Sequence, residues 1–163
     1  MVNVLCTDPL PQALIKTCEN KLPDGAIFEV VPDGELSTFA SMSGDAEILI
    51  VAHRRIDAEL LANAPKVRFI QRAGLGHENI IVKDTNAAGI PAAYTPGANA
   101  GAVAEHTIMH MLIAARRFAD GERAARANTF PNLEMAAEGI GDIAGATIGF
   151  IGMGYSGQAV AER

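Results

Sequence analysis

Short apolar runs alternate with amphipathic segments through the first part of this chain. Runs rich in apolar and β-branched residues predict strands over 2–6, 26–31, 46–52, 67–71 and 91–94. Between them, apolar positions at helical spacing predict helices over 9–20, 35–42 and 57–63. Because strands that alternate with helices are joined by right-handed crossovers, residues 1 to roughly 97 should form a flavodoxin-like α/β layer around a parallel sheet.

The second part of the chain begins after the turn residues Thr95-Pro96-Gly97. Asn99 is a candidate N-cap, and the pattern over 100–127 predicts one long helix. Apolar residues lie on more than one side of its middle, so we expect this helix to be buried between domains or subunits. Prolines and glycines over 128–146 predict a largely irregular connection. The expected domains are residues 1–98 and residues 99–163.

The last residues form a glycine-rich pattern, TIGFIGMGYSGQAVAER. The apolar run over 148–151 predicts a buried strand, and a helix should follow the glycines. Gly152, Gly154 and Gly157 have the spacing of the dinucleotide-binding motif G-x-G-x-x-G. In that motif the first glycine permits a tight turn, the second admits a pyrophosphate, and the third lets the helix pack closely. The alternative is that these glycines only form a tight turn.

Composition narrows the class of partner. Of the residues, 49% are hydrophobic and 20% are charged, which is typical of a globular protein. The net charge of −6 argues against nucleic acid and against an anionic membrane as partners. No targeting signal is evident and no apolar run approaches the roughly 20 residues of a membrane span, so we expect a cytoplasmic protein. Cys6 and Cys18 lack a metal-binding spacing and should be reduced thiols.

Three blocks of the sequence resemble the D-isomer specific 2-hydroxyacid dehydrogenase family, and in particular its phosphoglycerate dehydrogenase-like members. They are QRAGLGHENI at 71–80, GIPAAYTPGANAGAVAEHT at 89–107 and GFIGMGYSG at 149–157. The resemblance implies an oxidoreductase that transfers a hydride between a nicotinamide cofactor and a 2-hydroxy or 2-oxo acid. It also implies a substrate domain followed by the start of a Rossmann domain.

The resemblance extends to four substrate-binding positions. Gly74, Leu75 and Gly76 match the loop whose backbone N–H groups receive the substrate carboxylate in that family. Glycines suit this role because an anion can approach without a Cβ in its way. Asn99 matches the asparagine of the family's N-x-x-x-V-A-E block, where its amide can lie near substrate and cofactor. The competing interpretations are a plain strand-to-helix turn for the loop and the N-cap role for Asn99.

The expected cofactor-binding residues are those of the turn and one helical threonine: Gly152, Gly154, Tyr155, Ser156, Gly157 and Thr107. The Thr107 hydroxyl has two candidate roles, donation to a cofactor phosphate or a bond to a carbonyl of the preceding helical turn. The acidic residue that binds the adenine ribose usually lies roughly 20 residues beyond the glycines, whereas six residues follow Gly157. The cofactor is therefore expected to be NAD or NADP, without a choice between them.

The chain has four histidines, and His106 and His110 lie four residues apart on the predicted long helix. They could face one metal ion, but their order is not H-E-x-x-H and no third ligand is evident, so no metal site is predicted. Glu105 should be structural, bonded to a neighbouring amide or arginine. His77 replaces an aromatic residue common in the family, and Ile81 replaces an aspartate that usually caps the next short helix.

The family's catalytic arginine, histidine and glutamate lie beyond the glycine motif, so no catalytic residue is assigned in this chain. We expect the N-terminal part of a dehydrogenase, truncated and inactive alone, that associates through exposed surfaces of the nucleotide domain. In the complete enzyme, the resemblance implies a homodimer. Two alternatives stay open: a non-catalytic α/β module or subunit that binds a small acid, and a Rossmann enzyme with an S-adenosyl or flavin nucleotide.

Overall fold

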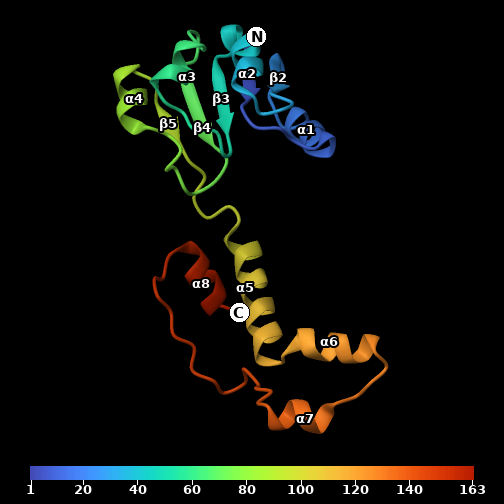
Figure 1. Ribbon diagram of the computed structural model, residues 1–163. Coiled ribbons are helices and arrows are strands. Elements are labelled where there is room, and N and C mark those ends of the chain that lie inside the picture. Colours follow the sequence, from blue (N-terminus) through green and yellow to red (C-terminus); the bar gives the residue numbers. More distant parts are fainter. The chain divides into compact units, whose positions relative to one another are not determined.

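The five runs expected to be strands form one parallel sheet in the computed structural model, which describes residues 1–163 (Figure 1). Across the sheet the strand order is β2-β1-β3-β4-β5. Because this is the order of flavodoxin-like folds, the expected fold class is confirmed. The strands are β1 (Val2–Cys6), β2 (Ala26–Val30), β3 (Ile48–Val51), β4 (Phe69–Arg72) and β5 (Ala92–Ala93).

Helices connect these strands, and most of them lie where the pattern predicts. They are α1 (Gln12–Glu19), α2 (Leu36–Met42), the short 3-10 helix η1 (Ser43–Asp45), α3 (Ala58–Ala62) and α4 (Val82–Ala87). The sequence did not predict α4, whose N-cap residue Ile81 makes no capping bond with its side chain. Instead, the Ile81 amide donates to the Ile56 carbonyl at 2.9 Å, and Asp84 Oδ2 accepts the Ala58 amide at 2.9 Å. These bonds join α4 to the start of α3.

The sheet is built around residues that oppose one another on neighbouring strands. Leu5, Leu49 and Ile70 lie in register on β1, β3 and β4, and none is more than 1% exposed. Phe39 and Ile56 belong to the same buried cluster and are fully buried. Burial of each of these side chains stabilises the folded state by about 1.5–3 kcal/mol. The loops at the edge of the sheet therefore extend from a well-packed core.

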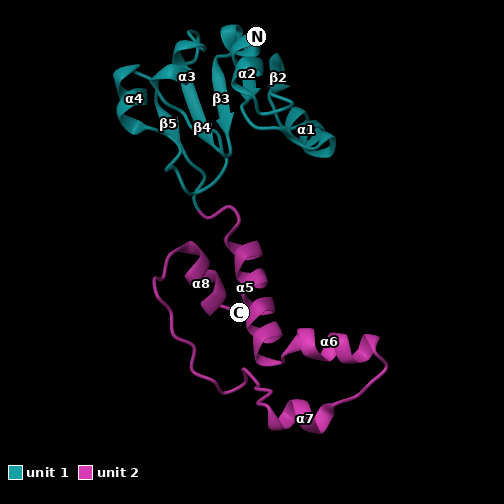
Figure 2. Ribbon diagram, viewed as in Figure 1, with its two compact units in different colours: residues 1–96 teal, residues 97–163 magenta.

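The chain divides into two compact units, Met1–Pro96 and Gly97–Arg163, which we call unit 1 and unit 2 (Figure 2). Unit 1 contains the sheet, and unit 2 contains helices alone. These are α5 (Ala100–Ala115), α6 (Phe118–Arg126), α7 (Asn132–Ala137) and α8 (Tyr155–Ala161). Within unit 2, α8 lies beside α5, and the two buried residues are Ala104 and Val160. None of the chain's helices combines the length and the apolar character that a membrane crossing requires.

The single long helix expected over 100–127 is wrong, because the chain leaves the helical path at Arg117. Arg117 has a φ of 48°, in the left-handed region, and α6 starts at the next residue. This conformation costs a residue with a Cβ about 1–2 kcal/mol. A carbonyl at the end of α5 receives its hydrogen bond from a distant segment, since the Gly141 amide donates to the Ala115 carbonyl at 2.9 Å.

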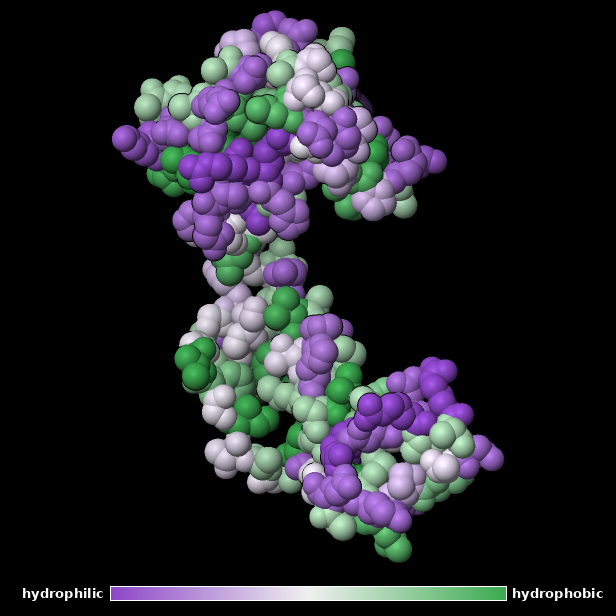
Figure 3. Space-filling view, in the orientation of Figure 1, coloured by the Kyte–Doolittle hydropathy of each residue, from purple (hydrophilic) through white to green (hydrophobic).

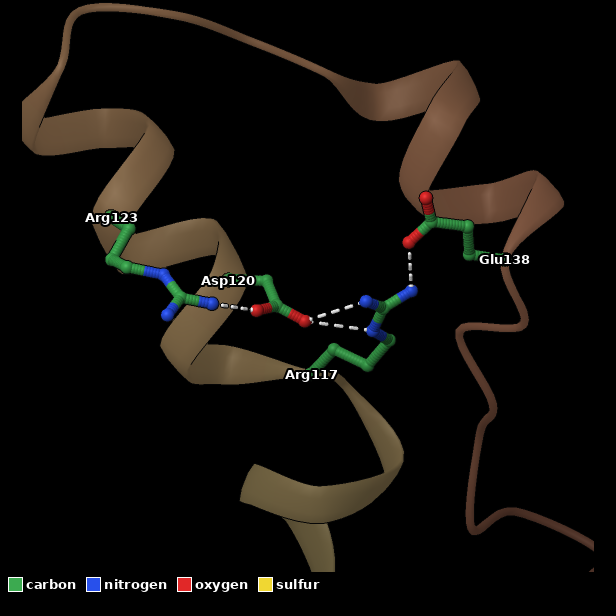
Figure 4. A network of polar contacts seen from close by, with 4 residues as sticks. All are labelled: Arg117, Asp120, Arg123 and Glu138. Carbon is green, nitrogen blue, oxygen red and sulfur yellow. Dashed lines mark hydrogen bonds and ion pairs between the residues drawn. The ribbon is translucent and has the colours of Figure 1, made fainter.

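An ion-pair network surrounds this break (Figure 4). The Arg117 guanidinium donates to Asp120 Oδ2 at 2.8 Å, in the first turn of α6, and also to Glu138, which follows α7. Asp120 accepts a further bond from Arg123. The hydrogen bond from Arg117 lowers the pKa of Asp120 below its usual range. The network thus links the break to the end of α7.

The strand expected over 148–151 is also wrong. These residues are irregular, and Ile151 is fully exposed. A strand needs a neighbour to receive its backbone N–H and C=O groups, and unit 2 contains no strand. The connection over 128–146, expected to be largely irregular, includes the helix α7.

Candidate functional site

The predicted carboxylate loop follows directly from β4, at the carboxyl end of the sheet; we call residues 73–77 the glycine loop. The Ala73 amide donates to the Val51 carbonyl at 2.8 Å, and the Thr95 amide donates to the Gly74 carbonyl at 3.0 Å. The amides of Leu75 and Gly76 make no hydrogen bond within the protein. They are therefore available to an anion, at the sheet edge where open α/β folds bind their ligands.

The two glycines of this loop leave space for neighbouring side chains. A Cβ on Gly74 would lie 3.1 Å from Nη1 of Arg72, and a Cβ on Gly76 would lie 2.7 Å from Oε2 of Glu78. Neither glycine has a positive φ. A side chain at either position would therefore displace the end of the Arg72 or Glu78 side chain, without backbone strain.

Arg72 brings a positive charge to the glycine loop, and the sequence analysis did not single it out. Its Nε donates to Asn79 Oδ1 at 3.2 Å, and Asn79 Nδ2 donates to the Arg54 carbonyl at 2.7 Å. These bonds hold the guanidinium beside Gly74. A guanidinium next to free amides favours a carboxylate ligand. The sequence signal that could have identified it is an arginine two residues before the first glycine of the loop.

Asp8 organises the neighbouring loop, which follows β3, and it too was missed. Its carboxylate accepts the amides of Ala52, His53 and Arg54 at 2.8, 2.8 and 3.1 Å, and the Thr7 hydroxyl at 2.8 Å. Burial raises the pKa of Asp8, but these four hydrogen bonds together outweigh burial and lower the pKa below its usual range. The loop that supplies the Arg54 carbonyl is thus fixed by a buried carboxylate.

His77 and Tyr94 stack on one another, with ring centroids 5.8 Å apart and planes inclined by 25°. Both rings line a small cleft together with Ile80 and Ala93. The sequence analysis treated His77 as a departure from the family pattern, and the structure gives it an aromatic partner. Leu75, at the tip of the glycine loop, is 49% exposed and free to contact a ligand.

In unit 2, the residues at the start of α5 have modest structural roles. Asn99 is the N-cap residue of α5, as predicted, and its carbonyl accepts the Val103 amide at 2.9 Å. Its side chain makes no capping hydrogen bond, however, and the Ala100 amide donates to the Gly97 carbonyl. The Thr107 hydroxyl donates to the Val103 carbonyl at 2.7 Å, which is the helical alternative considered from the sequence. Glu105 accepts a bond from Arg163 at 3.4 Å, in agreement with a structural role.

The glycine-rich turn precedes α8, and its three glycines have different surroundings. Gly152 has a φ of 88°, which favours glycine. No atom lies within 4 Å of a Cβ placed on Gly154, so its backbone is open. A Cβ on Gly157 would lie 3.0 Å from the Gly152 carbonyl oxygen, so this glycine permits the close approach of helix and turn. Thr107, Ser156 and two of these glycines, Gly152 and Gly157, line one cleft of unit 2.

Metal-ligating side chains do not gather into a larger cluster. No group of three or more His, Cys, Asp or Glu residues could hold an ion. The closest pair is His106 and His110, whose Nε2 atoms lie 2.9 Å apart on α5. Neither has a role in the candidate site described above.

Comparison with known proteins gives a family match over nearly the whole chain. The sequence model of one family, described as the catalytic domain of D-isomer specific 2-hydroxyacid dehydrogenase, matches residues 4–162. The D-3-phosphoglycerate dehydrogenase of Mycobacterium leprae is 31% identical, over 98% of this chain and 29% of that protein. The glyoxylate reductase of Thermococcus litoralis is 32% identical, over 73% of this chain and 37% of that protein.

A solved structure agrees with these matches. The TT0316 protein of Thermus thermophilus has a TM-score of 0.79 and 29% sequence identity, over 99% of this chain and 52% of that chain. The chain thus spans about half the length of this solved structure. It spans 29% and 37% of the lengths of the two curated relatives.

Proposed function

Because this chain belongs to the D-isomer specific 2-hydroxyacid dehydrogenase family, we propose that it supplies the acid-binding loop and first cofactor-binding turn of such an enzyme. The reaction is reversible hydride transfer between NAD or NADP and a small 2-hydroxy or 2-oxo acid. In this proposal, residues 1–98 are the substrate domain and residues 99–163 begin the nucleotide-binding domain. The observation that carries it is the glycine loop, with free amides and Arg72 together.

The substrate carboxylate is proposed to bind at the glycine loop. The amides of Leu75 and Gly76 donate to its oxygens, and the Arg72 guanidinium adds a charge-assisted contribution. The bond network through Asn79 holds Arg72 in place before the acid arrives, so little ordering is needed on binding. His77 belongs to this loop, and the ring of Tyr94 stacks on it, next to Thr95, whose amide donates to the Gly74 carbonyl. These two rings are proposed to select the remainder of the acid. Asn99 is the fourth proposed substrate contact.

The cofactor is proposed to bind with its pyrophosphate at the turn before α8. The residues fit this group because Gly154 offers open backbone, Gly157 permits close packing, and Gly152 adopts a φ that glycine favours. Tyr155 and Ser156 follow in the first turn of α8, and Thr107 lies at the same cleft. When bound, the nicotinamide supplies or accepts the hydride. The chain's own residues orient the cofactor and hold the acid.

A homodimer through unit 2 is part of the proposal. Ile108, Met109, Leu112, Ile113 and Phe118 line an apolar groove. In Figure 3, hydrophobic residues gather on the visible face of the α5 and α8 part of unit 2, whereas the α6 part is largely hydrophilic. Exposed apolar surface of this kind is typical of protein interfaces. We also propose a cytoplasmic location, which the two free thiols, Cys6 and Cys18, support.

Isothermal titration calorimetry tests this proposal on the full chain. Glyoxylate, pyruvate and hydroxypyruvate are titrated separately, and NAD and NADP are titrated in a second series. We expect at least one acid to bind without cofactor and at least one nucleotide to bind without acid. Binding of an acid with no binding of either nucleotide would favour the non-catalytic acid-binding module. No binding of any acid would contradict the assignment of the glycine loop.

A further inference from the structure

The two histidines of α5 form a preorganised pair that the proposed dehydrogenase chemistry does not use. His106 and His110 lie one helical turn apart, so their side chains point from the same side of α5. Their Nε2 atoms are 2.9 Å apart, and their ring planes are inclined by 78°. Both residues are exposed. The pair is therefore accessible to an ion in solution.

The separation of the two nitrogens matches that of two ligands on one metal ion. Imidazole nitrogens bind zinc at about 2.0–2.1 Å, so two of them on one ion lie roughly 2.9–3.4 Å apart, depending on the angle at the metal. The observed 2.9 Å lies at the lower end of this range. Small rotations of the rings can thus point both lone pairs at one ion without moving the backbone.

No other side chain competes for these nitrogens. Apart from the bond between them, His106 and His110 make no hydrogen bond or ion pair with their side chains. The neighbouring carboxylate, Glu105, is bonded to Arg163. In this hydrogen bond one ring carries its hydrogen on Nε2, so both Nε2 atoms can bind an ion when that ring carries its hydrogen on Nδ1 instead.

We propose that His106 and His110 bind one divalent late transition-metal ion, such as Zn²⁺, Ni²⁺ or Cu²⁺, as a two-ligand site on α5. Imidazole is a suitable ligand for these three ions. Since no cluster of three or more ligating side chains is present, water fills the remaining coordination positions. The site therefore takes up and releases its ion readily. This goes beyond the proposed dehydrogenase reaction, which needs no metal.

The test titrates the metal-free full chain with Ni²⁺ and with Zn²⁺ by calorimetry. Wild type should bind one ion at this pair, and His106→Gln and His110→Gln should each lose more than about tenfold in affinity. Removing a residue that only hydrogen-bonds to a ligating histidine already lowers metal affinity by about tenfold or more. Removing a ligating histidine itself should therefore lower the affinity at least as much. The matched control is His53→Gln, which changes an exposed histidine of unit 1 and should bind like wild type. Circular dichroism verifies that each variant keeps its helices.

Cu²⁺ gives an independent readout by electron paramagnetic resonance. The wild-type spectrum should show hyperfine coupling to two imidazole nitrogens, and each single variant should show coupling to one. Unchanged affinity in both single variants would overturn the proposal. It would also be overturned if wild type bound no more tightly than the variant that carries both substitutions.

Discussion

The ring of Tyr155 rests against Gly97, so closely that a Cβ at position 97 would lie 2.9 Å from Cδ1 of the tyrosine. Gly97 also has a φ of 72°, in the left-handed region. Both the close contact and the backbone conformation favour glycine at this position. The first residue of unit 2 is thereby tied to the start of α8 and to the glycine-rich turn.

Replacing Gly97 by alanine should destabilise unit 2. The strained φ alone costs about 1–2 kcal/mol in the free energy of unfolding, and the contact with Tyr155 adds to it. Urea denaturation followed by circular dichroism measures this loss. Gly149→Ala is the matched control, because a Cβ there meets no atom within 4 Å and its φ is not positive. Equal effects of the two substitutions would contradict the packing role of Gly97.

Asp8→Asn should destabilise unit 1 by about 2–3 kcal/mol, since hydrogen bonds to a charged group are worth more than neutral ones. The asparagine NH2 would also face backbone amides that need an acceptor. The control is Asp24→Asn, at an exposed aspartate without a hydrogen bond to its side chain. The measurement is the free energy of unfolding at neutral pH, and a similar loss in the control would count against the loop-holding role of Asp8.

The same carboxylate predicts a dependence of stability on pH. The pKa of Asp8 in the folded chain lies below its ordinary value of 3.8. A lowered pKa stabilises the folded state above the ordinary value, and this stabilisation is lost as the pH falls through the folded value. Wild type should therefore lose more stability than Asp8→Asn when the pH falls from about 5 to about 2. Parallel curves for the two proteins would show that the carboxylate is not responsible.

Arg117 allows the strain at the helix break to be separated from the ion pairs. Arg117→Ala keeps the left-handed strain and loses the pairs, whereas Arg117→Gly loses the pairs but relieves about 1–2 kcal/mol of strain. Because both variants lose the pairs, the strain decides their order, and the glycine variant should be the more stable of the two. At Arg123, within α6, the order should reverse because glycine disfavours a regular helix. Denaturation of the four variants tests both orders.

Arg72→Gln should weaken binding of a 2-oxo acid by about tenfold or more, because a charge-assisted bond is replaced by a neutral one. Glutamine retains a donor but not the charge. Arg68→Gln is the control, since Arg68 is exposed and pairs with Glu47. Calorimetry with the acid that binds wild type best measures both affinities. An equal loss in the two variants would indicate a general effect of net charge and not a specific contact.

The elements of unit 1 could be predicted because their signals are local. Apolar runs of strand length, such as 46–52, lie between turn residues, and each forms a strand in the sheet. The helix α4 was missed because long-range bonds hold it, from Ile81 to Ile56 and from Asp84 to Ala58. The break at Arg117 was missed for a similar reason, since arginine is no helix breaker by itself and its partner Glu138 is distant in the sequence.

The glycine loop could be proposed from its motif, whereas its surroundings could not. The Asp8 carboxylate accepts hydrogen bonds from amides 44 to 46 residues away, and no local sequence pattern predicts such a contact. Arg72 gains its position from Asn79, which only the fold brings near. The apolar pattern over 148–151 predicted a strand from composition alone, but a strand also depends on a neighbour to pair with.

Residue-resolved amide shifts in nuclear magnetic resonance test the central claim most directly. With the chain labelled with nitrogen-15, glyoxylate should shift the amides of Leu75, Gly76 and His77, and NADH should separately shift those of Gly154 to Gly157. Arg72→Gln should reduce the first response and leave the second unchanged. Shifts confined to other residues, or no shift in the glycine loop at saturating acid, would contradict the assignment of this chain as the acid-binding and cofactor-binding part of a 2-hydroxyacid dehydrogenase.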